Sequence, residues 1–229
     1  MHTPLIVLPH APTDSRITAV RAGVRLEQLT IVWMVVEAGV ALWAGVAARS
    51  GLLTAFGLDS VIELVSGGVL LWRLSVDAAG GRLDRVERAE RAAAWIVSGS
   101  LALLCVYIVA MAAWTLLAGA KPDGSLPGLV IAIAAVIGMP FLARAKRRVA
   151  ARIDSAALRG DAACSLTCAA MAGALLAGLG LHLMLGWWWA EPLAALGFLY
   201  WLIPETREAF SAARSGRVGC CSECASAGR

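Results

Sequence analysis

The chain has 229 residues, of which 59% are hydrophobic and 16% charged, and its mean hydropathy is +0.74. An average soluble domain is roughly a quarter charged and under half apolar. The apolar residues are gathered in blocks, which excludes an ordinary soluble enzyme, a disordered protein and a fibrous protein. We therefore predict an integral membrane protein.

Six apolar blocks predict six membrane spans. A spanning helix needs about 20 mostly apolar residues, because the hydrocarbon core is ~30 Å thick and a helix rises ~1.5 Å per residue. We therefore expect an all-α bundle of six transmembrane helices. The predicted spans are residues 29–48, 52–72, 94–118, 128–143, 161–185 and 187–203. The fourth is short and contains Pro140, and the tryptophans at 187–189 predict a tight interfacial turn before the last.

Positive charge orients these spans. Of the 20 Lys and Arg residues, all but Arg49 and Lys121 fall on one side of the predicted membrane. The positive-inside rule therefore places both termini in the cytoplasm. We expect a cytoplasmic arm (1–27), a six-helix transmembrane domain (28–203) and a short cytoplasmic tail (204–229). The cations are not interleaved with aromatic residues, so nucleic acid is not an expected partner, and no cleavable signal peptide is expected.

Acidic side chains within the spans indicate function, because ionisable groups are costly to insert into a bilayer. Asp59 and Glu63 in the second span are four residues apart and share one helix face. Two adjacent carboxylates in a low-dielectric site do not both ionise cheaply, so one holds a proton or a cation lies between them. The pair predicts a cation site coupled to protonation. Glu37 is a third acidic residue, in the first span, and three roles stay open for it. It is an extra metal ligand, a proton relay or the partner of a polar group on a neighbouring helix.

The fifth span carries a complementary set of donors. Asp161, Cys164 and Cys168 are spaced i, i+3 and i+7, which puts them on one helix face. Two thiols and two carboxylates would make a four-ligand shell that tetrahedral Zn²⁺ accepts, and thiolates also favour softer ions such as Cd²⁺ or Cu(I). Packing is the alternative interpretation, because a buried cysteine behaves as a small apolar residue. Cys105, which stands alone, is assigned to packing.

Polar residues near the outer ends of the last two spans have simple explanations. His182 is expected to be an interfacial residue. Glu191 precedes Pro192, and capping of the last helix is sufficient to explain both residues.

The predicted tail contains three cysteines, Cys220, Cys221 and Cys224. Disulfides are rare in the cytoplasm, so this CxxC-like spacing indicates metal or redox chemistry. A flexible tail that captures metal and an unstructured end with incidental cysteines both stay open.

Two stretches of the chain resemble the cation diffusion facilitator family. The segment SGLLTAFGLDSVIELVSGGVLLWR looks like the family's second span, with Asp59 and Glu63 on the two positions of its Asp-x-x-x-Asp or His-x-x-x-Asp pair. In the fifth span, the run ending AGALLAGLGL puts Cys164 and Cys168 on the family's His-x-x-x-Asp positions. Glu191 matches an acidic residue often found at the start of the family's sixth span. Cysteine at both fifth-span positions departs from the pattern and opens the site to softer metals.

The resemblance implies a non-enzymatic metal efflux transporter that exchanges a cation for protons by alternating access. Its metal site would consist of Asp59, Glu63, Cys164 and Cys168. Zn²⁺ is the expected cargo, with Cd²⁺, Co²⁺ and Cu(I) as alternatives, and no permanent cofactor is expected.

Further expectations concern the surroundings of that site. Asp161 and Glu37 are candidates for an auxiliary or proton-relay role, and the tail cysteines for cytosolic metal capture. The family's cytoplasmic C-terminal domain is expected to be absent. We therefore expect a homodimer held by its membrane helices in the inner (plasma) membrane.

Two functions from other classes stay open. A membrane thiol redox protein would use Cys164 and Cys168, although both are predicted within a span and no quinone or haem ligand set is visible. A non-transporting metal receptor would retain the fold but leaves Asp59 and Glu63 unexplained. Export and import need the same residues, so the direction of transport follows from the family resemblance and not from residue spacing.

Overall fold

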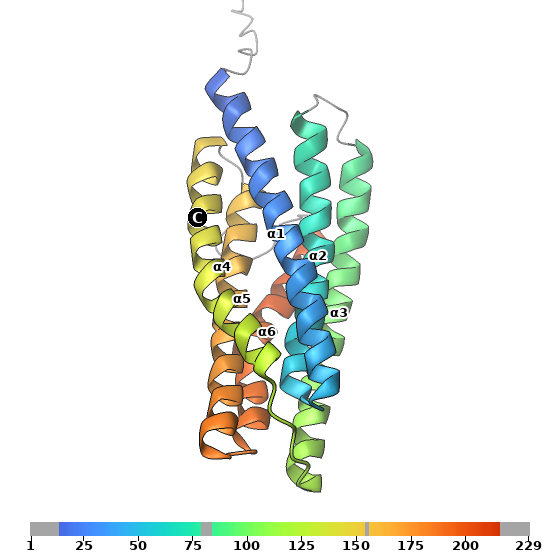
Figure 1. Cartoon of the computed structure of the whole chain (residues 1–229). Helices are drawn as coiled ribbons and strands as arrows, with labels where there is room; N and C mark the ends of the chain where they lie inside the picture. Colours follow the sequence, from blue (N-terminus) through green and yellow to red (C-terminus); the bar gives the residue numbers. More distant parts are fainter. Residues whose placement is uncertain (1–13, 79–83, 154–155, 216–229) are drawn as a thin grey trace, which may run out of the picture.

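Six antiparallel α-helices form the bundle in the computed structural model, which describes residues 14–78, 84–153 and 156–215 (Figure 1). They are α1 (Asp14–Ala47), α2 (Gly51–Ala78), α3 (Asp84–Ala118), α4 (Leu126–Ile153), α5 (Ala156–Leu185) and α6 (Ala190–Ser215). The α1–α2, α3–α4 and α5–α6 turns lie at one end, which is the outer end in the predicted orientation. This is the helical architecture that the sequence predicts.

Five of the described helices, α1 to α5, are long and apolar enough to cross a bilayer by length and composition. The sixth, α6, falls outside that group because it carries charged residues along its length. It nevertheless packs along α3 and α5. Its 26 residues extend over ~39 Å, so α6 runs through the same thickness as its neighbours.

Several helix ends differ from the predicted spans. The first helix begins at Asp14, within the segment expected to be an arm, because Ala22 and Leu26 pack against Val149 and Leu158. The fourth continues past Pro140 to Ile153. The last begins at Ala190, which leaves the tryptophans at 187–189 in the turn. In each case tertiary packing or turn geometry moved an end that hydropathy alone does not define.

The helices divide into a four-helix group and a pair. In the group, α1 packs on α2 and α4, and α4 packs on α5. The pair, α3 and α6, is joined to this group through α2 and α5. Phe56 of α2 and Phe198 of α6 meet edge to face in the shared core, 6.4 Å between ring centroids. The centre of the bundle therefore lies where α1, α2, α5 and α6 face one another.

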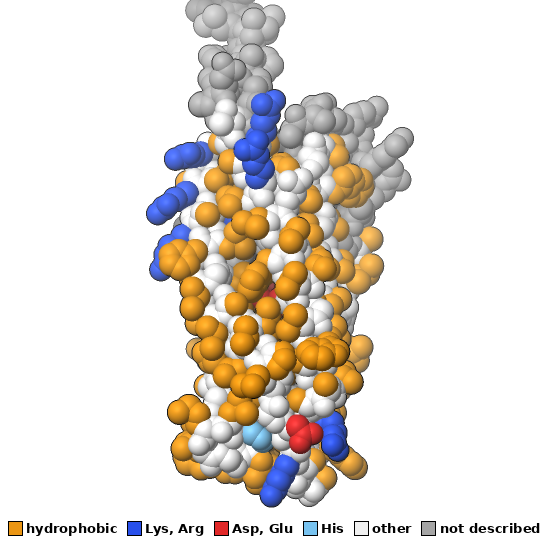
Figure 2. Space-filling view, viewed as in Figure 1, with side chains coloured by type: hydrophobic (Ala, Val, Ile, Leu, Met, Phe, Trp, Pro, Cys, Tyr) orange, Lys and Arg blue, Asp and Glu red, His pale blue; other side chains and the backbone are white. Residues whose placement is uncertain are grey.

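The outer surface of the bundle is apolar over its middle (Figure 2). Large hydrophobic side chains are exposed on every helix, including Trp43, Leu103 and Phe141. Most of the Lys and Arg side chains in this view gather at the end where α1 begins. An exposed apolar belt of this extent is the surface that lipid covers, and the charge distribution agrees with the predicted orientation.

Close contact between α1 and α2 depends on two glycines. A Cβ atom added at Gly57 would lie 2.8 Å from the backbone nitrogen of Leu42. One added at Gly45 would lie 2.7 Å from the backbone nitrogen of Thr54. Small residues let membrane helices approach each other in this way. The α2 face that carries Gly57 and Ser60 is therefore held close against α1.

Replacing Gly57 with valine is expected to lower the free energy of unfolding by about 1–3 kcal/mol or more, because backbone has to move to admit the side chain. Thermal unfolding in detergent, followed by tryptophan fluorescence, measures the loss. Gly68→Val is the matched control, since a Cβ at Gly68 of the same helix meets nothing within 4 Å. Equal melting temperatures for the two variants would contradict the close α1–α2 approach.

Candidate metal site

The two acidic residues predicted on the second span both point into the bundle. Asp59 is 2% exposed and Glu63 is 9% exposed. Among the described residues, Oδ2 of Asp59 and both carboxylate oxygens of Glu63 have no hydrogen-bond partner. Buried polar groups in proteins are nearly always hydrogen-bonded, so these three oxygens lack the partner that a proton or a cation would supply. The chemistry of the donors fits the predicted cation site.

The two cysteines predicted on the fifth span are buried near these carboxylates, and neither forms a disulfide. The thiol of Cys168 donates to Oε1 of Glu37 across 3.5 Å and also lies beside the Glu63 carboxylate. The thiol of Cys164 lies within hydrogen-bonding reach of Glu205 on α6. Thiols and carboxylates from α1, α2, α5 and α6 therefore form one buried polar cluster.

Glu37 is the best-anchored carboxylate of the cluster. Its Oε1 accepts hydrogen bonds from Ser60 (2.8 Å) and Cys168, and its Oε2 accepts one from the indole nitrogen of Trp33 (2.6 Å). These contacts join α1 to α2 and α5. The sequence left three roles open for Glu37. In this conformation it acts as the hydrogen-bond partner of residues on neighbouring helices.

Glu205 is an acidic member of the cluster that the predicted spans left out. It follows the predicted end of the sixth span at residue 203, but α6 continues to Ser215. Its Oε2 is buried and without a hydrogen-bond partner in the described part of the chain. The carboxylate is close enough to Asp59 and Glu63 for their charges to interact.

Helical periodicity in the sequence is the signal that could have identified Glu205 as a residue facing the core. It lies three residues beyond Leu202 and seven beyond Phe198, and both of these side chains are fully buried. Residues at these spacings share one helix face. A helix that continues past residue 203 therefore carries this carboxylate toward the core.

A small cavity extends from the cluster toward the cytoplasmic half of the bundle. It has a volume of about 30 Å³, and Glu63, Cys164 and Glu205 lie along it together with Asp161. This volume holds about one or two water molecules. The cavity is therefore large enough for a largely dehydrated cation beside the thiols and carboxylates.

The donors do not form a ready-made metal site in this conformation. Within residues 14–78, 84–153 and 156–215, no three His, Cys, Asp or Glu side chains are close enough together to hold a metal ion. Cys168 lies beside Glu63 and Cys164 beside Glu205, so the two thiols have different carboxylate neighbours. The four predicted ligands share one cluster, but a common coordination shell needs the helices to move.

Asp161 belongs to a buried ion cluster nearer the cytoplasm. Its carboxylate binds the ammonium group of Lys146, which is also 3.2 Å from Oε2 of Glu27. The side chains of Lys146 and Glu27 are fully buried. The predicted spans put Lys146 among the cations of a cytoplasmic loop, and this was wrong: α4 extends beyond its predicted span and turns Lys146 into the bundle. Its carboxylate partners come from α1 and α5.

A second polar group lies at the outer end. Glu191 lies in the first turn of α6, as capping requires, but it is also 1% exposed and accepts a hydrogen bond from the hydroxyl of Ser50. His182 of α5 is close to it, with Nδ1 3.9 Å from Oε2 of Glu191. The expected interfacial histidine therefore faces a buried carboxylate. The predicted tail cysteines Cys220, Cys221 and Cys224 lie outside the described residues.

Comparison with models of protein families matches residues 28–215 to the cation efflux transmembrane domain. The comparison with curated proteins found no match. The matched segment covers most of the chain and includes all six helices from Gln28 onward. Members of this family are transporters and not enzymes, and their substrates are metal cations. The chain is therefore a multi-pass membrane protein that belongs to the cation efflux, or cation diffusion facilitator, family.

Proposed function

We propose that this transporter exports a divalent or soft heavy-metal cation in exchange for protons, with Asp59, Glu63, Cys164 and Cys168 as its central ligands. The main support is the set of buried carboxylate oxygens without partners beside two buried thiols that form no disulfide. Zn²⁺ is the expected cargo, and Cd²⁺, Co²⁺ and Cu(I) are the alternatives. Glu205 adds a carboxylate that would replace one ligand as the helices move.

Proton coupling follows from the ligands themselves. Thiolate and carboxylate groups bind metal only when deprotonated, so metal binding releases protons and protonation expels metal. Alternating access of the cluster to the two sides then exchanges one cation for protons. Lower pH on the loading side is expected to slow transport, because protons compete with the metal for the same donors. Initial rates of flux at a series of loading-side pH values measure this effect.

The inner (plasma) membrane is the expected location, since it suits an exporter whose positive end faces the cytoplasm. A homodimer would be held by the exposed apolar faces of the helices. The different carboxylate neighbours of the two thiols favour ligand roles over a redox role, in which the thiols would have to meet each other.

Metal flux into proteoliposomes under a pH gradient tests the proposal. The wild type is expected to carry metal, and Cys164→Ser/Cys168→Ser is expected to lose its preference for Cd²⁺ over Co²⁺ by about tenfold or more, which corresponds to ~1.4 kcal/mol. Cys105→Ser, on α3, is the matched control and should keep the preference. If the double variant carries every metal at the wild-type rate, the two cysteines are packing residues and not ligands.

A further inference from the structure

Two buried atoms at the outer end of the bundle face each other without a bond. They are Oε2 of Glu191 and Nδ1 of His182, 3.9 Å apart. Among the described residues neither atom has a hydrogen-bond partner. A hydrogen bond between nitrogen and oxygen spans about 2.7–3.2 Å, so this separation is too long for one. The gap is therefore wide enough for an intervening ligand.

The Glu191 carboxylate is held in place by its other oxygen. Ser50 donates its hydroxyl hydrogen to Oε1 and accepts a hydrogen bond from the backbone nitrogen of Leu53 (3.1 Å). Ser50 thus caps the start of α2 and orients the carboxylate of α6 at the same time. The second oxygen of Glu191 is left to face His182 on α5.

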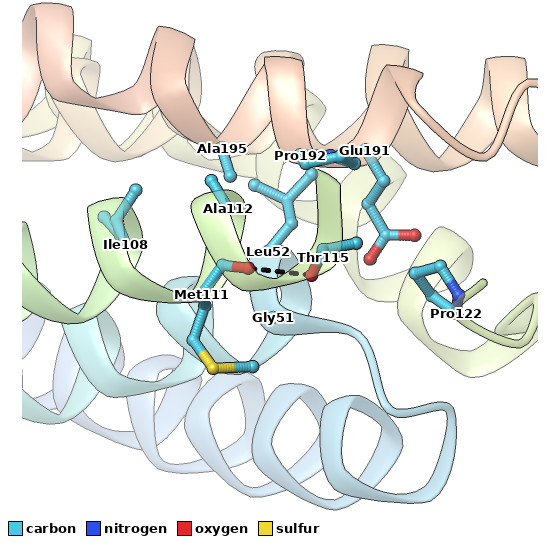
Figure 3. Close-up of a pocket in the computed structure, with 10 residues that line it drawn as sticks. All are labelled: Gly51, Leu52, Ile108, Met111, Ala112, Thr115, Pro122, Glu191, Pro192 and Ala195. Carbon is cyan, nitrogen blue, oxygen red and sulfur yellow. Dashed lines mark hydrogen bonds between the residues drawn. The ribbon is translucent and has the colours of Figure 1, made fainter. Parts of the chain in front are cut away.

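A small cavity borders the carboxylate. It has a volume of about 10 Å³, and its lining includes Gly51, Thr115, Pro122 and Glu191 (Figure 3). This is space for about one water molecule. A ligand bound to Glu191 would therefore have room for a water beside it.

We propose that Glu191 and His182 form an outer cation site, distinct from the central cluster, for a borderline divalent ion such as Zn²⁺ or Co²⁺. Zinc binds imidazole nitrogen and carboxylate oxygen at about 2.0–2.2 Å, so one ion between the two atoms spans up to ~4 Å. Imidazole and carboxylate suit such ions, whereas soft ions prefer thiolate. Water would supply the remaining ligands.

The outer site deepens the proposed function, because it would bind the transported cation after the cation leaves the central cluster. This role in transport rests on the proposed function, whereas binding of a cation by the two residues does not. His182 lies 14 residues beyond Cys168 on α5, which is ~21 Å along the helix axis. A cation that leaves the sulfur ligands would next meet nitrogen and oxygen ligands. These hold a soft ion less tightly, which favours release to the outside.

Chemical modification of histidine tests the site without a transport assay. Purified protein is treated with diethylpyrocarbonate with and without Zn²⁺, and mass spectrometry follows His182, with His2 and His10 of the same chain as reference histidines. Zn²⁺ at about ten times its dissociation constant is expected to slow modification of His182 about tenfold. The reference histidines should be slowed less. No protection of His182 in the wild type would overturn the proposal and leave a bridging water as the occupant.

Two variants separate the outer site from the central one. Glu191→Gln is expected to remove the protection of His182, whereas Cys164→Ser/Cys168→Ser is expected to keep it. Protection that survives Glu191→Gln would rule out the assigned ligand pair. Because the first arm uses the wild type, the proposal can fail even if a variant does not fold. If the cysteine variant loses flux but Zn²⁺ still protects His182, the outer site is supported and the loss concerns only the central ligands of the proposed function.

Discussion

Replacing Asp59 with asparagine is expected to abolish metal transport while leaving the fold intact. Asparagine keeps the size of the side chain but removes the charge and one oxygen donor from a carboxylate whose Oδ2 has no partner among the described residues. Loss of a group that only hydrogen-bonds to a metal ligand costs about 10–100-fold in metal affinity, so loss of a ligand should reduce flux by at least about 100-fold. Proteoliposome flux measures the effect, and circular dichroism with size-exclusion chromatography checks the fold.

Asp123→Asn is the matched control for this substitution. Asp123 lies in the outer α3–α4 connection, where its carboxylate is 64% exposed and pairs with Arg49 at 3.5 Å. An exposed ion pair contributes little, so transport should stay near the wild-type rate. If Asp59→Asn transports metal at the wild-type rate, Asp59 is not a metal ligand.

Replacing Lys146 with methionine is expected to destabilise the bundle by about 3–5 kcal/mol. The substitution removes the positive charge that Glu27 and Asp161 share and leaves two carboxylates without a counter-ion. Breaking a buried ion pair by removing one partner has a cost of this size. Thermal unfolding in detergent measures it, with Arg148→Met, at an exposed position of the same helix, as the matched control.

A charge-balanced variant tests whether electrostatics is the cause. Glu27→Gln/Lys146→Met/Asp161→Asn removes all three charges, and replacing a buried ion cluster by neutral groups is often close to neutral in stability. The triple variant should therefore recover much of the stability that Lys146→Met loses. If the single variant unfolds at the same temperature as Arg148→Met, the ion cluster does not stabilise the bundle.

The Lys146 cluster also bears on how a cation reaches the centre. Asp161 contacts Lys146 and lines the cavity that leads to Glu63 and Glu205. Its expected auxiliary or proton-relay role stays a prediction. In this conformation a cation that binds Asp161 has to compete with the ammonium group of Lys146.

Hydropathy and charge along the chain were enough to define the membrane class, the number of helices and the expected orientation. Hydropathy and charge are properties of single segments, so they can be evaluated without knowing which helices are neighbours. Helical periodicity likewise put Asp59 and Glu63 on one face of their helix, and Cys164 and Cys168 on one face of theirs.

Which of these faces meet is a property of the packed bundle. Periodicity defines a face but not the helix packed against it, so Glu205, Lys146 and Glu27 were not recognised as buried partners. These residues lie where α1, α4 and α6 extend beyond their predicted spans, and packing between helices determines how far each extends. The approach of His182 to Glu191 has the same origin, because these two side chains from separate helices meet only when the bundle closes around Ser50.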